Sequence, residues 1–238
     1  MLNCKNVVEM DMEGTTDAFF RGFFDTKEEV QETDTHFRCQ DGKPDFEYRL
    51  VYKIKTPRKN TKFSLQGYDF DLFSNELIGE AQIDLKELLN DSSLTKKPLT
   101  LNKRYYDEVM SKTDKNMKLK FDDDDDNKFW VGLMSKNKAG KIESRGDVRV
   151  QIDVVPIDMA IKNPVGKARD NPNHSPYLPA PEGRIEFSMN PLKMFNQLVG
   201  PAVRRKLAMS LCCILCILIT LPALPNIMAN AVVKMIFG

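Results

Sequence analysis

The most restrictive feature of this chain is an apolar stretch near its C-terminus, residues 207–224. No charged residue occurs between Lys206 and Lys234. A mostly apolar segment of about 18–20 residues is long enough to cross the hydrocarbon core of a bilayer as a helix. We therefore predict a transmembrane helix at residues 204–226, followed by a short luminal or extracellular tail at residues 227–238.

Basic residues flank this stretch unequally. Arg204, Arg205 and Lys206 precede it, whereas only Lys234 follows it. Because basic flanks stay on the cytosolic side, we expect a single-pass protein whose N-terminal domain is cytosolic. The alternative is a buried core helix, which is disfavoured because a small domain cannot cover a run that is apolar on all sides.

The composition excludes several classes of function. Lysine and arginine total 35 against 34 aspartates and glutamates, so the net charge gives no support for a nucleic-acid partner. The sequence has no P-loop, no G-x-S-x-G and no H-E-x-x-H motif. We therefore expect no catalytic residues, no enzyme activity and no small-molecule substrate.

The first 160 residues have the pattern of an all-β domain. Segments rich in aromatic and β-branched residues alternate with turns that contain Gly, Pro, Asn and Asp. We predict an antiparallel β-sandwich over residues 1–160, in which the first strand is short or missing because only residues 1–8 precede the first turn. The expected strands are 18–24, 46–55, 62–68, 78–85, 129–134 and 147–155.

Two further segments are expected to lie outside the sandwich. Residues 109–127 are polar and end in five consecutive aspartates at 122–126, so we predict a disordered insertion, because like charges cannot pack together. Residues 161–203 begin with a proline-rich stretch, which predicts an extended linker followed by a juxtamembrane segment.

Carboxylates gather in two short segments. Asp11 and Asp17 flank a glycine turn ahead of a predicted strand, and Asp69 and Asp71 end another strand, with Glu76 five positions further on. Alternate residues of a strand point the same way, so Asp69 and Asp71 can share one ion. Carboxylates on adjacent loops repel one another unless a hard cation neutralises them, and calcium accepts roughly six to eight oxygens. Either pair alone is a weak signal, because acidic surface turns are common.

Together the two segments resemble the first and third loops of C2 domains. Residues 4–21 (CKNVVEMDMEGTTDAFFR) match the lysine-asparagine strand end, the M-D, the glycine and the T-D of the first loop. Residues 69–79 match the D-x-D-x-x-S and the final I-G of the third. The resemblance implies a Ca²⁺ site whose ligands are Asp11, Asp17, Asp69, Asp71 and Glu76.

Other residues narrow the resemblance to the C-terminal region of ferlins. Residues 33–37 (TDTHF), Gly42 and residues 46–49 look like the T-D-x-H…G…F-x-W-R run of the last ferlin C2 domain, with Tyr48 in place of Trp. Residues 163–173 are similar to the P-x-G-x-x-R-x-x-P-N linker that follows that domain. The resemblance implies a tail-anchored phospholipid-binding protein of a vesicle membrane or the plasma membrane, which acts in calcium-triggered vesicle exocytosis, membrane fusion or membrane repair. Its expected partners are anionic phospholipid membranes and fusion-machinery proteins.

Two sets of residues are candidates for membrane contact. Phe70, Leu72 and Phe73 alternate with the acidic residues, and each could supply about 1.5–3 kcal/mol on entering a bilayer, although some could face the core instead. A basic hairpin could hold phosphoinositide headgroups or be simply solvated. Its residues are Lys53, Lys55, Arg58, Lys59 and Lys62. The alternative function is a calcium-independent tail-anchored scaffold that binds a partner protein or a phosphoinositide.

Overall fold

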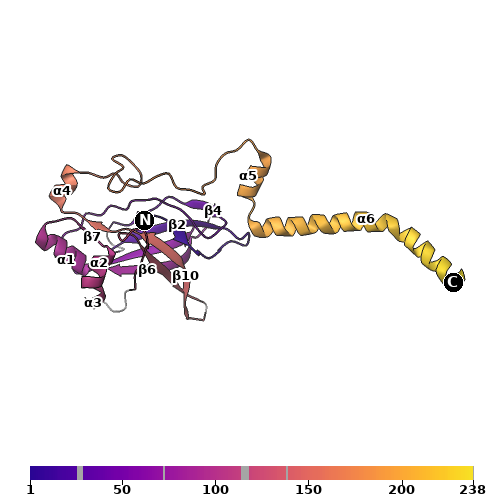
Figure 1. Ribbon diagram of the computed structural model, residues 1–238, viewed down its shortest axis with the longest axis horizontal. Coiled ribbons are helices and arrows are strands. Elements are labelled where there is room, and N and C mark those ends of the chain that lie inside the picture. The colour runs from indigo at the N-terminus through magenta and orange to yellow at the C-terminus, as the bar shows by residue number, and fades with distance from the viewer. Residues whose placement is uncertain (26–28, 72, 114–117, 138, 238) are drawn as a thin grey trace.

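The computed structural model describes residues 1–237 except 26–28, 72, 114–117 and 138, and the side chains of residues 223–234 and 237 are also left out. The chain folds into a β-sandwich from which a long C-terminal helix extends (Figure 1). A segment without strands joins the two parts and runs back along the sandwich.

Among the described residues, nine strands form one antiparallel sheet that curls on itself. They are β1 (Cys4–Lys5), β2 (Thr16–Phe23), β3 (Gln31–Glu32), β4 (His36–Cys39), β5 (Lys62–Asp69), β6 (Glu76–Asp84), β8 (Lys120–Phe121), β9 (Phe129–Lys136) and β10 (Ile142–Val150). The order across the sheet is β1-β10-β9-β6-β5-β2-β3, with β4 paired to β2 and β8 to β9. A separate pair joins β7 (Leu99–Thr100) to β11 (Asp153–Val154).

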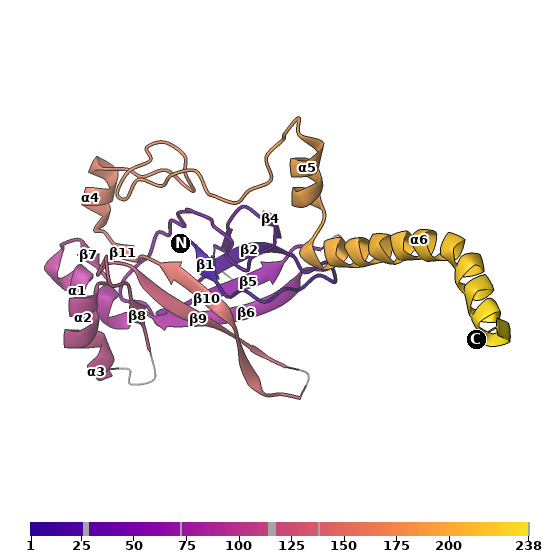
Figure 2. The same cartoon turned by 45° about the vertical axis from the view of Figure 1, so that its right-hand side comes forward.

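Both halves of the curled sheet contribute to one core. Phe20, Leu65 and Ile78 from β2, β5 and β6 are fully buried together with Leu133 and Val148 from β9 and β10. Apolar burial of this kind is the dominant favourable term in folding. The predicted antiparallel β-sandwich is therefore confirmed, and its first strand, β1, is short. Helix α1 (Lys86–Thr95) covers one end of the core (Figure 2).

The predicted strand at residues 46–55 is only partly confirmed. Its alternate side chains, from Phe46 to Ile54, pack against the core as expected. Its backbone forms no regular ladder, however: the amide of Tyr48 donates to the carbonyl of Met1, and the amide of Val51 donates to the side chain of Gln31. Hydrophobic alternation determines which side chains are buried, but it does not determine the partner of each amide.

The prediction of disorder for residues 109–127 is wrong for the part that the structure describes. The turn α2 (Lys103–Tyr105), a π-helical turn (Tyr106–Met110) and α3 (Ser111–Thr113) lead toward strand β8. Asp122, the first of the five aspartates, forms an ion pair with Arg149 at 2.6 Å and accepts a hydrogen bond from Trp130 Nε1 at 2.6 Å. A cation and a donor from the sheet offset the repulsion that motivated the prediction. Residues 114–117 lie outside the described part.

The proline-rich linker, which follows α4 (Ile157–Lys162), is docked on the sandwich instead of standing free. Three arginines hold it through backbone carbonyls. Arg49 donates to the carbonyl of Pro176 at 2.6 Å, Arg169 to that of Phe46 at 2.7 Å and Arg184 to that of Asp45 at 2.7 Å. Asp34 pairs with both Arg169 and Arg184, at 2.6 and 3.2 Å.

The chain ends in two helices, α5 (Pro191–Leu198) and α6 (Pro201–Phe237). Helix α6 points away from the sandwich (Figure 1) and continues into the region that we predicted as a tail, residues 227–238. Among the helices whose residues are described, none is long and apolar enough to cross a membrane. The predicted membrane-spanning helix at residues 204–226 is therefore not confirmed.

Candidate functional site

Two loops meet at one end of the sandwich because of how their strands pair. Strands β2 and β5 are antiparallel neighbours, with Ala18 opposite Asp69, so the start of β2 lies beside the end of β5. We call residues 9–15 loop one and residues 70–75 loop three. The pairing places the acidic residues of both loops at the same edge of the sheet.

Three of the five predicted ligands converge at this edge. One carboxylate oxygen from each of Asp11, Asp69 and Asp71 lies within 4.8 Å of the others, and we call these three residues the acidic group. Thr15 Oγ1 donates to Asp11 Oδ2 at 2.8 Å and so orients this carboxylate. Calcium binds carboxylate oxygens at about 2.3–2.6 Å, so oxygens at this separation fit one ion.

The other two predicted ligands are placed differently. Asp17 Oδ1 accepts a hydrogen bond from the amide of Arg38 at 2.6 Å, and the amide of Asp17 donates to Asp69 Oδ1 at 2.6 Å. Asp17 therefore braces the loops and orients Asp69. Glu76 lies opposite Asp69 in the β5–β6 ladder, but it is exposed and its carboxylate is outside the acidic group. A ligand role for all five residues stays a prediction.

The electrostatics of this edge disfavour its negative charge. Burial is the main reason that the pKa of Asp69 rises to about 7, and the charges of Asp11, Asp17 and Asp71 raise it further. The amide of Asp17 opposes this rise by donating to the carboxylate. Asp69 is only 3% exposed. A carboxylate that is costly to ionise in this place gains strongly from a neighbouring cation.

The predicted membrane-contacting residues differ in exposure. Phe73 is 100% exposed, whereas Phe70 is 42% exposed, with its ring edge-on to that of Phe37 at 6.0 Å between centroids. Leu72 lies outside the described residues. Sequence reasoning missed Met12, which is 95% exposed in loop one. The signal for it was an apolar residue between two acids in a turn.

The basic hairpin lies away from the acidic group. Lys62 begins β5 and Asp69 ends it, so about 23 Å of strand separates them. Lys53 and Lys55 are exposed, and with Arg58 they line a pocket of about 290 Å³. The guanidinium of Arg58 lies over the ring of Phe24, 4.8 Å from its centroid. Lys59 and Lys62 are exposed and are not part of this pocket.

Comparison with known proteins agrees with this architecture. A model of the C2 domain matches residues 1–101. Over 177 residues, 73% of this chain, the sequence is 28% identical to Ferlin 1 of Toxoplasma gondii. Over 163 residues, 66% of this chain, it is 29% identical to Ferlin 2 of Tetrahymena thermophila. The chain contains a ferlin-like C2 region. The matches cover only 10% and 8% of these two ferlins.

Solved structures of C2 domains resemble the ferlin-like C2 region at 13% sequence identity. A C2 domain of plant Extended Synaptotagmin 1 matches over 62% of this chain and 86% of its own, with a TM-score of 0.36. BON1-C2B matches over 65% of this chain and 88% of its own, with a TM-score of 0.33. These TM-scores are too low to define the fold, which rests on the sheet and on the sequence match.

Proposed function

We propose that this ferlin-like C2 region is a non-enzymatic, calcium-dependent phospholipid-binding module that acts in vesicle fusion, exocytosis or membrane repair. The observation that carries the proposal is the convergence of Asp11, Asp69 and Asp71 beside two fully exposed apolar side chains, Met12 and Phe73. The acidic group opposes binding to an anionic membrane, whereas the apolar side chains favour it. A bound cation neutralises the acidic group and so removes its repulsion of the lipid.

The mechanism begins with repulsion. Without a cation, the acidic group repels anionic lipid headgroups, and the cost of bringing Asp69 to its ionised form is high because it is buried. Bound calcium would supply positive charge and open coordination positions for lipid phosphate. Asp11, Asp69 and Asp71 would hold it, with Asp17 orienting Asp69. Met12 and Phe73 would then enter the bilayer, each contributing about 1.5–3 kcal/mol.

We also propose that residues 207–224 attach the chain to a membrane, so that the C2 domain acts as a tail-anchored module on the cytosolic side. The support is the uncharged apolar sequence behind three basic residues, Arg204, Arg205 and Lys206. Fusion-machinery proteins remain candidate partners through the family resemblance.

Co-sedimentation with vesicles of phosphatidylcholine and phosphatidylserine tests the calcium switch. A chain ending at residue 203 should bind in calcium and be released by a chelator. The double variant Asp69→Asn, Asp71→Asn should lose calcium-dependent binding. The matched control is Asp123→Asn, Asp124→Asn, which removes two exposed charges outside the acidic group. Binding that ignores both calcium and the first double variant would refute the switch.

A second candidate function is calcium-independent binding of phosphoinositides. The pocket lined by Lys53, Lys55 and Arg58 favours it. Two exposed ammonium groups and a guanidinium that lies over Phe24 meet at one opening, where the only acidic residue among the described residues that line it is Glu29. In a chelator, vesicles that contain phosphatidylinositol bisphosphate should then retain the protein. Lys53→Gln together with Lys55→Gln should release it. Retention of this double variant would exclude the pocket.

A further inference from the structure

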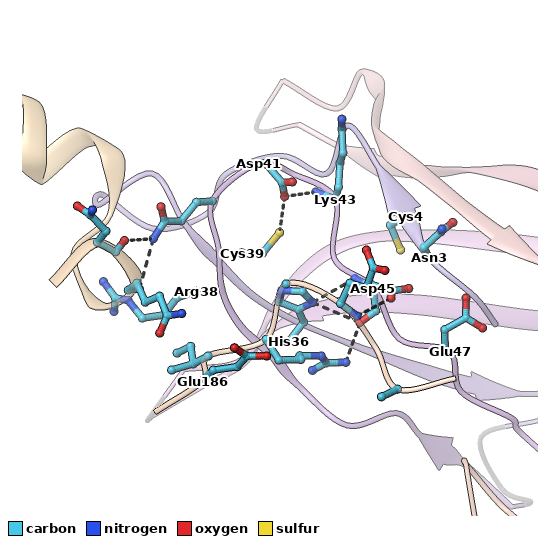
Figure 3. A pocket seen from close by; sticks show the side chains of 18 of the residues that line it. Asn3, Cys4, His36, Arg38, Cys39, Asp41, Lys43, Asp45, Glu47 and Glu186 are labelled. Atoms are coloured by element: carbon cyan, nitrogen blue, oxygen red, sulfur yellow. Dashed lines mark hydrogen bonds between the residues drawn. The ribbon is translucent and has the colours of Figure 1, made fainter. Parts of the chain in front are cut away.

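Helix α5 is held against the sandwich by hydrogen bonds to the backbone of its last turn. The side chain of Gln40 donates to the carbonyls of Asn196 and Gln197, at 3.0 and 3.3 Å. Lys193, Asn196 and Gln197, together with Leu192, line a cavity of about 1290 Å³ between the helix, the linker and the sandwich. Figure 3 shows the part of this cavity around His36 and Asp45. If α5 packed on the domain by its apolar side, Phe195 and Leu198 would face the sandwich and the polar residues would face water.

Two apolar residues of α5 face away from this cavity. At 100° per residue, Phe195 and Leu198 lie on one face, opposite Lys193, Asn196 and Gln197, whereas Leu192 lies at the cavity. Phe195 is 42% exposed and Leu198 is 48% exposed. Phe187 and Met189, in the segment just before the helix, are even more exposed. An apolar surface of this kind, rimmed by polar residues, is typical of a contact site.

Close packing holds this surface at the same end of the molecule as the acidic group. The amide of Ala202, at the start of α6, donates to the carbonyl of Glu13 in loop one at 3.1 Å. A Cβ atom on Gly200 would overlap the same oxygen, so only glycine permits this approach. Arg204 adds a hydrogen bond to Gln40 at 2.8 Å. Helix α5 thus lies at the end of the linker, beside the start of α6 (Figures 1 and 2).

The charges near this surface indicate which kind of partner it binds. Helix α5 has no acidic residue and one lysine, Lys193, which pairs with Glu186 at 3.4 Å, and three basic residues, 204–206, follow at the start of α6. An apolar face flanked by cations fits the interface of an anionic bilayer, where the apolar side chains enter the acyl boundary and the cations stay among the headgroups. Exposed apolar side chains also follow along α6 from Leu207 onward.

We propose that the apolar face of α5 is a second lipid-contacting surface, separate from loops one and three, that lies on the bilayer to which α6 leads. It orients the sandwich so that the acidic group faces that same bilayer. The proposal rests on the proposed membrane attachment through residues 207–224. It does not require calcium, because no residue of the acidic group belongs to α5.

Tryptophan quenching in vesicles tests this surface in the full-length chain. Leu198→Trp places a fluorophore on the exposed face of α5, and wild-type protein, with Trp130 as its single tryptophan, gives the background. The emission of the new tryptophan is the variant's emission minus that background. In vesicles of brominated phosphatidylcholine and phosphatidylserine it should fall well below its value in the same lipids without bromine, in calcium and in chelator alike. Leu94→Trp is the control, because Leu94 is exposed on α1 at the opposite end of the sandwich (Figure 1).

Three outcomes would overturn the proposal. Equal quenching at positions 94 and 198 would show that α5 makes no specific lipid contact. A concentration-dependent blue shift of Leu198→Trp without vesicles would assign the face to a second copy of this chain. Absence of quenching at 198 in protein that floats with the vesicles would leave α5 in water. Failure of the calcium switch alone would be seen separately, as a Phe73→Trp probe that is quenched to the same extent with and without calcium.

Discussion

At the scale of single residues, Asp69 connects the fold to the proposed site. Its carboxylate is buried, accepts the amide hydrogen of Asp17 and belongs to the acidic group. The pKa of Asp69 rises to about 7 because burial and the neighbouring carboxylates disfavour its anion. The same buried acid that destabilises the metal-free domain at high pH is thus available to a cation.

This pKa sets the direction of a pH effect on stability. Between the ordinary pKa of 3.8 and about 7, the folded chain binds more protons at Asp69 than the unfolded chain does. The stabilisation is complete below the ordinary value and is lost as pH rises through the folded value. Burial raises the pKa of Asp17 in the same direction. We expect the metal-free chain to melt at a lower temperature at about pH 8 than at about pH 5.

Replacement of Asp69 by Asn should change both responses. The amide oxygen can still accept the hydrogen bond from Asp17, but no buried charge remains, so the metal-free melting temperature at high pH should rise. Calcium should stabilise the wild-type chain, by about 2.7 kcal/mol at a hundredfold excess over its dissociation constant, and should not stabilise the variant. Scanning calorimetry with and without calcium measures both effects. A variant that calcium stabilises as strongly as wild type would contradict the assignment.

At the scale of elements, the linker behaves as part of the domain because arginines join the two. Arg49 of the domain binds the backbone of the linker, and Arg169 and Arg184 of the linker bind the backbone of the domain. Arg184 donates to the carbonyl of Asp45 and to Asp34 while lying over the ring of Phe46. A substitution there removes several partly buried contacts at once. Exposed ion pairs of the same chemistry contribute far less.

Arg184→Ala should therefore lower the free energy of unfolding by about 1–3 kcal/mol and speed proteolysis within residues 163–190. The control is Arg104→Ala, because Arg104 pairs with Glu108 while both side chains are largely exposed. That change should stay within about 0.5 kcal/mol of wild type. Denaturant titration and limited proteolysis provide the two readouts. Equal effects of the two variants would mean that the linker is not held through Arg184.

A similar comparison tests the contact between loop one and α6. In Gly200→Ala the new methyl group would overlap the carbonyl oxygen of Glu13, so the contact must open. Hydrogen exchange at the amide of Ala202 should become faster. Gly132→Ala is the matched control, since its Cβ would meet ordinary contacts at 3.7 and 3.9 Å. Unchanged exchange in Gly200→Ala would show that the amide of Ala202 is protected in another way.

At the scale of the whole molecule, the apolar and acidic features gather at one end. The acidic group, Met12, Phe73, α5 and the start of α6 lie there, whereas α1 is at the opposite end (Figure 1). This arrangement favours contact with the bilayer next to the chain's own C-terminal helix. Calcium would then change how closely the domain approaches that bilayer.

Alkaline carbonate extraction tests the attachment through residues 207–224. The full-length chain should stay with the membrane pellet, because an apolar segment of about 18–20 residues is costly to transfer to water. A chain ending at residue 203 should move to the supernatant. Release of the full-length chain would show that this segment does not insert.

The extent to which sequence predicted this fold differs from segment to segment. Strands β2, β5, β6 and β9 were expected within a few residues, because local alternation and turn chemistry determine them. Residues 46–55 failed as a ladder because their amides bond to Met1 and to a side chain of β3, and neither partner is encoded locally. The predictions of an extended linker and of a disordered acidic run failed for the same reason, because partners far away in the sequence hold both segments.

The sequence by itself determined the alternating core, the two acidic loops and the apolar C-terminal stretch, since each depends on residues close together in the chain. Only the tertiary structure decided which carboxylates meet. Asp11, Asp69 and Asp71 converge because β2 pairs with β5, whereas Asp17 is taken by the amide of Arg38. It also decided which side of α5 faces water. Contacts between residues far apart in sequence determine both arrangements, and no local sequence pattern predicts these contacts.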